Sequence, residues 1–146
     1  ERLRRYFPGC ALTADMITGF PGETEADQAA AVAFLEQVGF AAVHVFPYSR
    51  RPGTKADAMP EQLSHAVKSA RAHEAQRVAD ACKQRYLVQQ VGQTLPVLFE
   101  TEHDGSWVGH SDNYCLVRAA GDDLRGLVKN VKISAVSGQM LVGDLV

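Results

Sequence analysis

The first half of the chain alternates between short apolar runs and one amphipathic stretch. Residues 12–17 form an apolar run that ends at a turn with Gly19 and Gly22, and residues 43–46 form a second run that ends at Pro47. Apolar runs bounded by Gly and Pro predict buried strands. Between the runs, one helical face is apolar at Ala30, Ala31, Phe34, Leu35 and Val38. The order strand, glycine turn, helix, strand predicts two parallel neighbours.

Both ends of the predicted helix carry a signal in the sequence. Thr24 is expected to be the N-cap, with Asp27 three residues later in a variant of the capping box. Gly39 occupies the place of a C′ glycine. Further upstream, residues 1–6 have the pattern of a helix end, which the following Pro-Gly pair closes.

The second half of the chain predicts a long helix followed by short strands. Residues 51–60 are rich in Pro and Gly and predict a loop, after which Glu61 is expected to open a helix that reaches about Gln90. Gly92 ends it. Strand-like runs with frequent turns follow at residues 94–100, near Trp107, and at 115–119, 126–134 and 139–146. This spacing suits a small OB-like barrel.

Length and composition agree with this division. We expect an α/β part over residues 1–58, a connecting helix over 59–91 and a barrel over 92–146, and an apolar fraction of 46% suffices for a core. No stretch has the length of a membrane span, and no signal peptide is visible. The cysteines Cys10, Cys82 and Cys115 are odd in number and lack metal-ligand spacing, which argues against a secreted disulfide framework. A cytoplasmic protein is expected.

The charge balance does not by itself indicate nucleic-acid binding. The net charge is -2, and acidic residues outnumber basic ones after Gly92. RNA binding by this part would require its few cations on one face, because phosphate contacts dominate affinity. Lys129 and Lys132 either contribute to such a face or are ordinary solvated strand residues. The sequence leaves both interpretations open.

Two motifs together resemble a known family. Residues 19–24 read Gly-Phe-Pro-Gly-Glu-Thr, and residues 44–54 read His-Val-Phe-Pro-Tyr-Ser-Arg-Arg-Pro-Gly-Thr. In this order they resemble the radical-SAM methylthiotransferases, and they are most similar to the branch that modifies threonylcarbamoyladenosine in tRNA. The resemblance runs from Thr13 to Val146, and its last part is similar to a TRAM domain. It implies the last strands and helices of a partial TIM-type radical-SAM barrel, then a long helix and a small antiparallel OB-like TRAM barrel.

The resemblance also implies a cofactor-binding region in the first part. Ile17 and Phe46 would contact the adenine of S-adenosylmethionine, Gly19 would let the backbone approach, and Tyr48 would lie at the mouth of the site. By its position in the turn, the carboxylate of Glu23 is expected to face a bound amine or hydroxyl. The alternative is that Ile17 and Phe46 are simply barrel core.

Candidate RNA-binding residues lie in the loop after the second strand and in the last part. A guanidinium of Arg50 or Arg51 would bind tRNA phosphate or the cofactor carboxylate, unless both are ordinary exposed loop residues. Tyr114 would stack on a base and Asn113 would hydrogen-bond one, unless they lie in the barrel wall and in a turn. The cations expected to contact phosphate are Arg118, Lys129 and Lys132.

One departure from the family limits what this chain is expected to do. Catalysis in this family needs a Cys-x3-Cys-x2-Cys motif, which holds the cluster that cleaves S-adenosylmethionine, and a second cluster on an N-terminal domain. This sequence contains neither this motif nor the cysteines for the second cluster. We therefore expect the C-terminal part of a longer enzyme, which uses S-adenosylmethionine and two 4Fe-4S clusters and acts beside the tRNA anticodon. Alone, this part is expected to be inactive, with no catalytic residue, no metal and no bound cofactor.

The sequence also allows other functions for this chain. The chain is alternatively a non-catalytic RNA-binding or interaction module, or part of a methylthiotransferase for isopentenyladenosine tRNA or for a ribosomal protein. The ribosomal-protein branch tends to carry an acidic residue where Arg51-Pro52-Gly53 stands, which favours tRNA. No membrane contact is expected. Strands with open edges are expected to make this chain self-associate.

Overall fold

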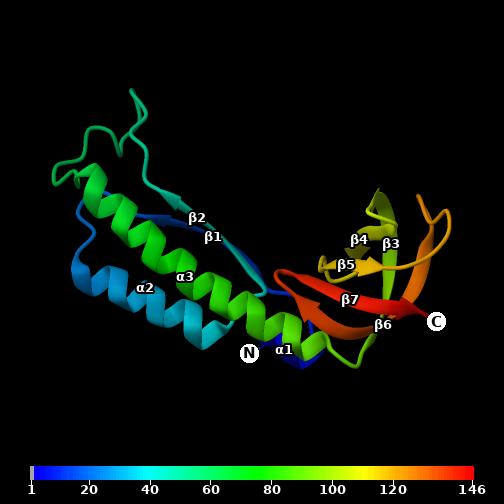
Figure 1. Ribbon diagram of the computed structural model, residues 1–146. Helices are drawn as coiled ribbons and strands as arrows, with labels where there is room; N and C mark the ends of the chain where they lie inside the picture. Colours follow the sequence, from blue (N-terminus) through cyan, green and yellow to red (C-terminus); the bar gives the residue numbers. More distant parts are fainter. Residues whose placement is uncertain (1) are drawn as a thin grey trace. The chain divides into compact units, whose positions relative to one another are not determined.

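The computed structural model describes residues 2–146 (Figure 1). The chain divides into two compact units. The α/β unit is Leu12–Lys83, and the barrel unit combines Gln84–Val146 with the described residues up to Ala11. Helix α3 (His65–Gln90) contributes residues to both.

The α/β unit has the predicted order of strand, helix, strand. It contains β1 (Thr13–Thr18), α2 (Glu25–Val38), β2 (Ala42–Pro47) and most of α3. The strands pair in parallel, and α2 and α3 lie side by side next to them (Figure 1). Their common core consists of Leu35, Val43, Ala75, Val78, Ala79 and Cys82. The α/β class and the parallel pair predicted from the sequence are therefore confirmed.

Both predicted caps of α2 are present. The backbone N–H of Asp27 donates to the Thr24 hydroxyl at 3.2 Å, and the Asp27 carboxylate accepts from the Thr24 backbone N–H at 2.9 Å. At the other end, Gly39 has a φ of 61° and its N–H donates to the Leu35 carbonyl at 2.9 Å. Two local hydrogen-bond patterns thus set the length of α2.

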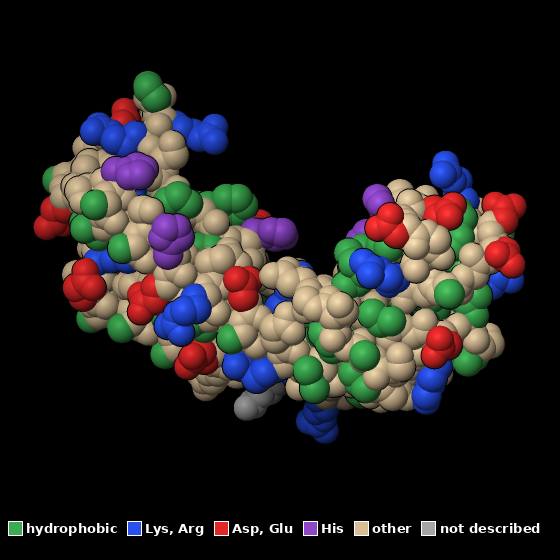
Figure 2. All heavy atoms as spheres, viewed as in Figure 1, with side chains coloured by type: hydrophobic (Ala, Val, Ile, Leu, Met, Phe, Trp, Pro, Cys, Tyr) green, Lys and Arg blue, Asp and Glu red, His purple; other side chains and the backbone are tan. Residues whose placement is uncertain are grey.

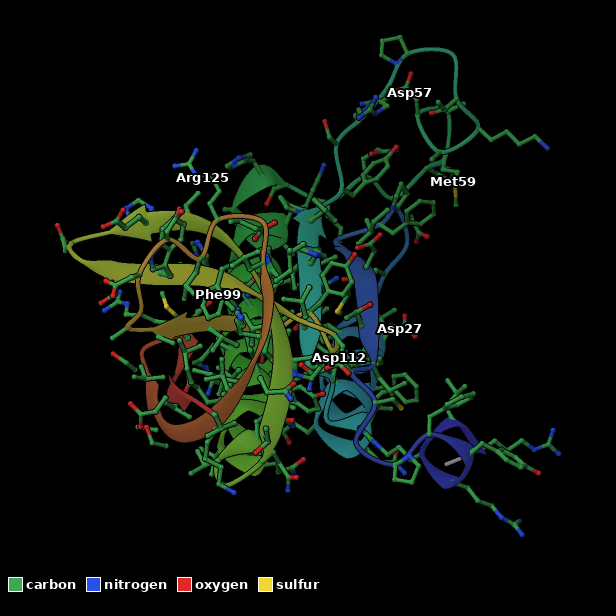
Figure 3. The ribbon with its side chains drawn as sticks, turned by 90° about the vertical axis from the view of Figure 1, so that its right-hand side faces the viewer. Asp27, Asp57, Met59, Phe99, Asp112 and Arg125 are labelled. Carbon is green, nitrogen blue, oxygen red and sulfur yellow. The ribbon has the colours of Figure 1, made fainter. Side chains whose placement is uncertain are left out.

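The start of the long helix was predicted too early. Helix α3 begins at His65, not at Glu61, because Glu61 has a φ of 58° and left-handed backbone cannot continue a helix. Ser64 caps the N-terminus of α3, since its hydroxyl accepts from the Val67 N–H at 3.3 Å. Asp57 and Met59, labelled in Figure 3, lie in the loop that precedes α3.

The barrel unit contains α1 (Arg2–Tyr6) and five strands. The strands are β3 (Thr94–His103), β4 (Ser106–Ser111), β5 (Leu116–Ala119), β6 (Val128–Ser137) and β7 (Met140–Leu145). They form one mixed sheet in the order β3-β4-β5-β7-β6, which closes because β6 also pairs with β3. Its core holds Phe99, labelled in Figure 3, with Val97, Val117, Val131, Ile133 and Leu141.

The expectation that all strands of this sheet are antiparallel was wrong. β5 and β7 pair in parallel, with Val117 opposite Leu141 and Arg118 opposite Val142. β7 follows β6 through a tight turn and therefore runs antiparallel to it, and its other edge meets β5, which runs in the same direction. A parallel pair cannot be joined by a short hairpin, so a pattern of short strands and turns does not reveal it.

Among residues 2–146, no helix combines the length and the apolar character needed to cross a membrane.

Candidate functional site

A cleft of about 440 Å³ lies where β1 and β2 end in the α/β unit. Ile17 and Phe46 are opposite each other in the parallel pair, and both line the cleft. Their side chains are 56% and 51% exposed, so neither belongs to the core of this unit. Ligands of α/β folds bind at the carboxyl ends of parallel strands. The cleft therefore offers two apolar side chains, side by side, to a flat molecule.

Tyr48 is one of the polar residues that line this cleft, and its ring contacts neighbouring side chains. Its backbone N–H donates to the Thr18 carbonyl at 2.8 Å, and its ring packs edge-on against Phe20 with centroids 5.2 Å apart. The Lys68 ammonium lies 5.1 Å from the ring centroid. Within residues 2–146, the buried Tyr48 hydroxyl has no hydrogen-bond partner. A buried hydroxyl without a partner suits a ligand that brings a polar atom.

Gly19 and Glu23 shape the turn after β1 and do not line the cleft. Gly19 has a φ of 71°, and a Cβ placed on it would lie 2.5 Å from Cγ of Lys68. The Glu23 carboxylate accepts from the Gly19 N–H at 2.9 Å and from Arg71 at 2.6 Å. Through these contacts, the Glu23 carboxylate stabilises the turn after β1. The expected contact of Glu23 with a bound amine or hydroxyl stays a prediction.

Arg71 is a residue that the sequence reasoning missed. Its side chain is only 6% exposed, and it pairs with Glu25 at 2.7 Å as well as with Glu23. Hydrogen bonds to Glu25 and Glu23 raise the pKa of Arg71, against the opposing effect of burial. The signal was its spacing, since Val67, Arg71 and Ala75 follow each other at intervals of four on one face of α3.

The two neighbouring loop arginines have different surroundings. Arg50 donates from Nε to the Asp57 carboxylate at 2.7 Å and from Nη2 to the Asp57 carbonyl at 2.9 Å. Both contacts lie inside the loop between β2 and α3. Arg51 instead lines the cleft with Ile17 and Phe46. Of the two, Arg51 is the cation placed to meet an anionic group in the cleft.

The barrel unit holds a second hollow, of about 320 Å³. We call it the barrel groove, and it is lined by Pro96, Leu98, Glu100, His110, Ser111, Asp112, Tyr114 and Val128. Tyr114 is 86% exposed and so does not lie in the barrel wall. The Asn113 amide donates to Gln90 at 3.0 Å, and its carbonyl accepts from the Ser111 hydroxyl at 2.6 Å. Asn113 thus lies in a hydrogen-bonded turn, and Tyr114 remains available for stacking.

The three cations expected to contact phosphate are not gathered on one strand face. Lys129 and Lys132 are three residues apart on β6, which places them on opposite sides of that strand. The Lys132 ammonium donates to the Gly92 carbonyl at 2.6 Å, and Arg118 belongs to β5. On the face of the barrel unit that Figure 2 shows, acidic and basic side chains are interspersed. The expected contact of Arg118, Lys129 and Lys132 with phosphate stays a prediction.

The residues that the structure describes do not fit an iron-sulfur cluster. Within residues 2–146, no three His, Cys, Asp or Glu side chains are grouped as metal ligands. Cys82 lies in the core of the α/β unit, and Cys115 is buried in the barrel unit. The third cysteine, Cys10, is half-buried. These three cysteines therefore do not form a common set of cluster ligands.

Comparison with known proteins finds relatives of this chain among tRNA-modifying enzymes, although no family model matches it. It is 37% identical, over 91% of its length, to the threonylcarbamoyladenosine tRNA methylthiotransferase MtaB of Bacillus subtilis. It is 40% and 35% identical, over 99% of its length, to the tRNA-2-methylthio-N(6)-dimethylallyladenosine synthases of Maricaulis maris and Campylobacter jejuni. The chain spans about a third of the length of these relatives, namely 31%, 32% and 34%. Over nearly its whole length, the chain is therefore homologous to a segment of tRNA methylthiotransferases that makes up about a third of their length.

Proposed function

We propose that this chain is the C-terminal part of an enzyme that methylthiolates C2 of N6-threonylcarbamoyladenosine beside the tRNA anticodon. The observation that carries the proposal is the exposed pair of Ile17 and Phe46 at the ends of two parallel strands, in a chain homologous to tRNA methylthiotransferases. In this proposal, the cleft is part of the wall around S-adenosylmethionine, and the barrel unit docks the tRNA.

The chemistry of the cleft fits this cofactor. An adenine has two flat faces and a polar edge, which match the apolar side chains of Ile17 and Phe46 and the unpartnered hydroxyl of Tyr48. Arg51 would balance the charge of the cofactor carboxylate. When bound in the whole enzyme, S-adenosylmethionine supplies the radical and the methyl group. The residues of this chain bind it and exclude water from one side.

The barrel unit supports a docking role. Five strands that close on themselves with short connections are the architecture of OB-like domains, which bind oligonucleotides. We assign this unit to the TRAM type on that architecture and on the resemblance of residues 109–114 to the Asn-Tyr segment of TRAM domains.

A second substrate has specific support. The relatives from Maricaulis maris and Campylobacter jejuni are named for dimethylallyladenosine and are as similar to this chain as the Bacillus subtilis relative. The test expresses the full-length protein in a bacterial strain without its own tRNA methylthiotransferases, followed by mass spectrometry of tRNA nucleosides. 2-Methylthio-threonylcarbamoyladenosine supports the proposal. 2-Methylthio-dimethylallyladenosine alone supports the second substrate. If the tRNA contains neither product, both proposed substrates are wrong.

The cleft is tested in the same full-length protein. Phe46→Ala removes one apolar face, so we expect the KM for S-adenosylmethionine to rise about tenfold, because burying such a ring contributes about 1.5–3 kcal/mol. Phe34→Ala is the matched control, since Phe34 is 56% exposed on α2 and does not line the cleft. Equal KM values for the two variants would contradict the cofactor role of the cleft.

A further inference from the structure

The barrel groove has an apolar floor at the surface of the barrel unit. Leu98 on β3 and Val128 on β6 are 42% and 62% exposed, and they lie opposite each other in the antiparallel pair. Pro96 extends the floor along β3. Exposed β-strand side chains of this kind offer a flat apolar surface.

Tyr114 stands at the border of this floor in a backbone conformation that is unfavourable for its residue type. Its φ is 60°, which a bulky residue rarely adopts. The turn is held by two hydrogen bonds, from the Tyr114 N–H to the Ser111 carbonyl at 2.9 Å and from the Cys115 N–H to the Ser111 hydroxyl at 3.0 Å. The ring remains exposed, 6.2 Å from the ring of His110. Backbone strain that keeps an aromatic ring in solvent is typical of binding sites.

Two carboxylates border the groove, and they differ in their partners. Glu100 is bound to Nδ1 of His110 at 2.6 Å, which fixes both side chains. In the part of the chain that the structure describes, the Asp112 carboxylate has no hydrogen-bond or ion-pair partner. The groove therefore joins an aromatic ring and an apolar floor to one available acceptor.

We propose that the barrel groove binds one unpaired guanine, stacked on Tyr114 and hydrogen-bonded through its N1–H and N2–H to the Asp112 carboxylate. This proposal rests on the proposed function, which supplies RNA as the partner. Guanine presents two adjacent N–H donors on its pairing edge, and these match the two oxygens of a carboxylate. Adenine and cytosine present an acceptor next to their amino group, and uracil presents one donor between two acceptors.

This mode of binding agrees with the charge of the barrel unit. A carboxylate repels phosphate, and the cations Lys129 and Lys132 lie on opposite sides of β6. Recognition through stacking and a base edge requires few phosphate contacts, so the affinity depends only weakly on salt. The acidic character of the unit is then compatible with RNA binding.

The test uses the 146-residue chain and short fluorescent oligoribonucleotides in anisotropy titrations at two salt concentrations. The probes are an oligouridine and the same strand with one central guanosine, adenosine or cytidine. We expect the guanosine strand to bind at least about fivefold more tightly than oligouridine. Tyr114→Ala should weaken every strand about fivefold or more. Tyr114→Phe keeps the ring and should bind like the unchanged chain.

The role of Asp112 has its own matched control. Asp112→Asn should remove the preference for guanosine, whereas Asp104→Asn, with the same change of charge in the turn between β3 and β4, should retain it. Circular dichroism verifies that each variant is folded. Equal effects of the two variants, equal affinity for all strands, or no binding of any strand would each overturn the proposal.

Failure of this proposal and failure of the proposed function are distinguishable. If affinity depends steeply on salt and falls only when Arg118, Lys129 or Lys132 is changed to Ala, RNA contacts the barrel unit through phosphate. The guanine proposal is then wrong, and the docking role stands. Absence of any methylthiolated nucleoside in the mass-spectrometric test would instead contradict the proposed function.

Discussion

At the scale of single residues, the turn after β1 shows how a motif that suggests a ligand site is held by the protein itself. Glu23 accepts from Gly19 and Arg71, and Lys68 packs where a side chain at position 19 would lie. These contacts connect the turn to α3. The turn thereby keeps the end of β1, and with it the cleft, in one geometry.

We expect Gly19→Ala to lower the free energy of unfolding of the α/β unit by about 2–5 kcal/mol. The left-handed backbone costs about 1–2 kcal/mol for a residue with a Cβ, and the contact with Lys68 adds an overpacking cost of about 1–3 kcal/mol. Gly39→Ala is the control, because its φ is also positive but no atom lies within 4 Å of the added Cβ. Urea unfolding, followed by the helical circular dichroism signal, measures the free energy of unfolding of both variants. Equal losses would mean that the Lys68 contact is unimportant.

Tyr86 predicts a loss of stability at alkaline pH. Burial, followed by the charges of neighbouring groups such as Cys115, raises the pKa of Tyr86 from 10.0 to about 12, and its hydroxyl donates to the Gly9 carbonyl at 2.9 Å. The folded state therefore holds this proton more tightly than the unfolded state does. Its contribution is complete below pH 10 and is lost as the pH rises towards about 12.

The measurement for Tyr86 is urea unfolding at a series of pH values between neutral and strongly alkaline, followed by the fluorescence of Trp107 in the barrel unit. We expect Tyr86→Phe to lose about 1 kcal/mol at neutral pH with its hydrogen bond, and to show a shallower alkaline decline than the unchanged chain. The same alkaline slope in both proteins would show that another group is responsible.

At the scale of elements, the features that local chemistry decides were predictable, and those that distant contacts decide were not. Thr24, Asp27 and Gly39 bound α2 through partners within four residues, so the sequence predicted both ends of the helix. The parallel pairing of β5 with β7 depends on how the barrel closes. The left-handed backbone of Glu61 also has a distant partner, because its carbonyl accepts from the Gly22 N–H.

The same distinction holds for the candidate site. The resemblance to the radical-SAM methylthiotransferases implied that Ile17, Phe46 and Tyr48 share one region, and all three line the cleft. Arg71 was missed because its partners Glu23 and Glu25 are more than forty residues away in the sequence. A charged residue on an apolar helix face was the available signal.

For helix α2 we expect Thr24→Ala to lower the free energy of unfolding by about 1 kcal/mol. The substitution leaves the N–H of Asp27 without its acceptor and removes the hydroxyl that donates to the Asp27 carboxylate at 2.7 Å. Thr24→Ser keeps the hydroxyl and should lose little. Urea unfolding followed by circular dichroism compares the two, and a Ser variant as unstable as the Ala variant would contradict the capping role.

At the scale of the whole molecule, the two units differ in how their strands are completed. The five strands of the barrel unit pair on both sides, whereas β1 and β2 pair only with each other within residues 2–146. Ile17 and Phe46 add exposed apolar surface to these open edges. Open edges and apolar surface together favour pairing with another chain.

We expect the 146-residue chain to self-associate at high concentration through the β1–β2 pair. Light scattering coupled to gel filtration should give a mass that rises with concentration. Phe46→Glu should return the chain to a monomer, and Phe34→Glu, an equally polar change on α2, should not. A monomeric mass at every concentration would show that the open edges of β1 and β2 do not pair with another chain in solution.

The place of β7 between β5 and β6 has a consequence for synthesis on the ribosome. The ribosome makes β5 and β6 before β7. The sheet closes only when β7 (Met140–Leu145) has emerged and paired with both of them. Until then, the nascent sheet is an open ribbon, and Leu141 is missing from its core. A ribosome that stalls before this strand would thus expose an incomplete sheet to chaperones and proteases.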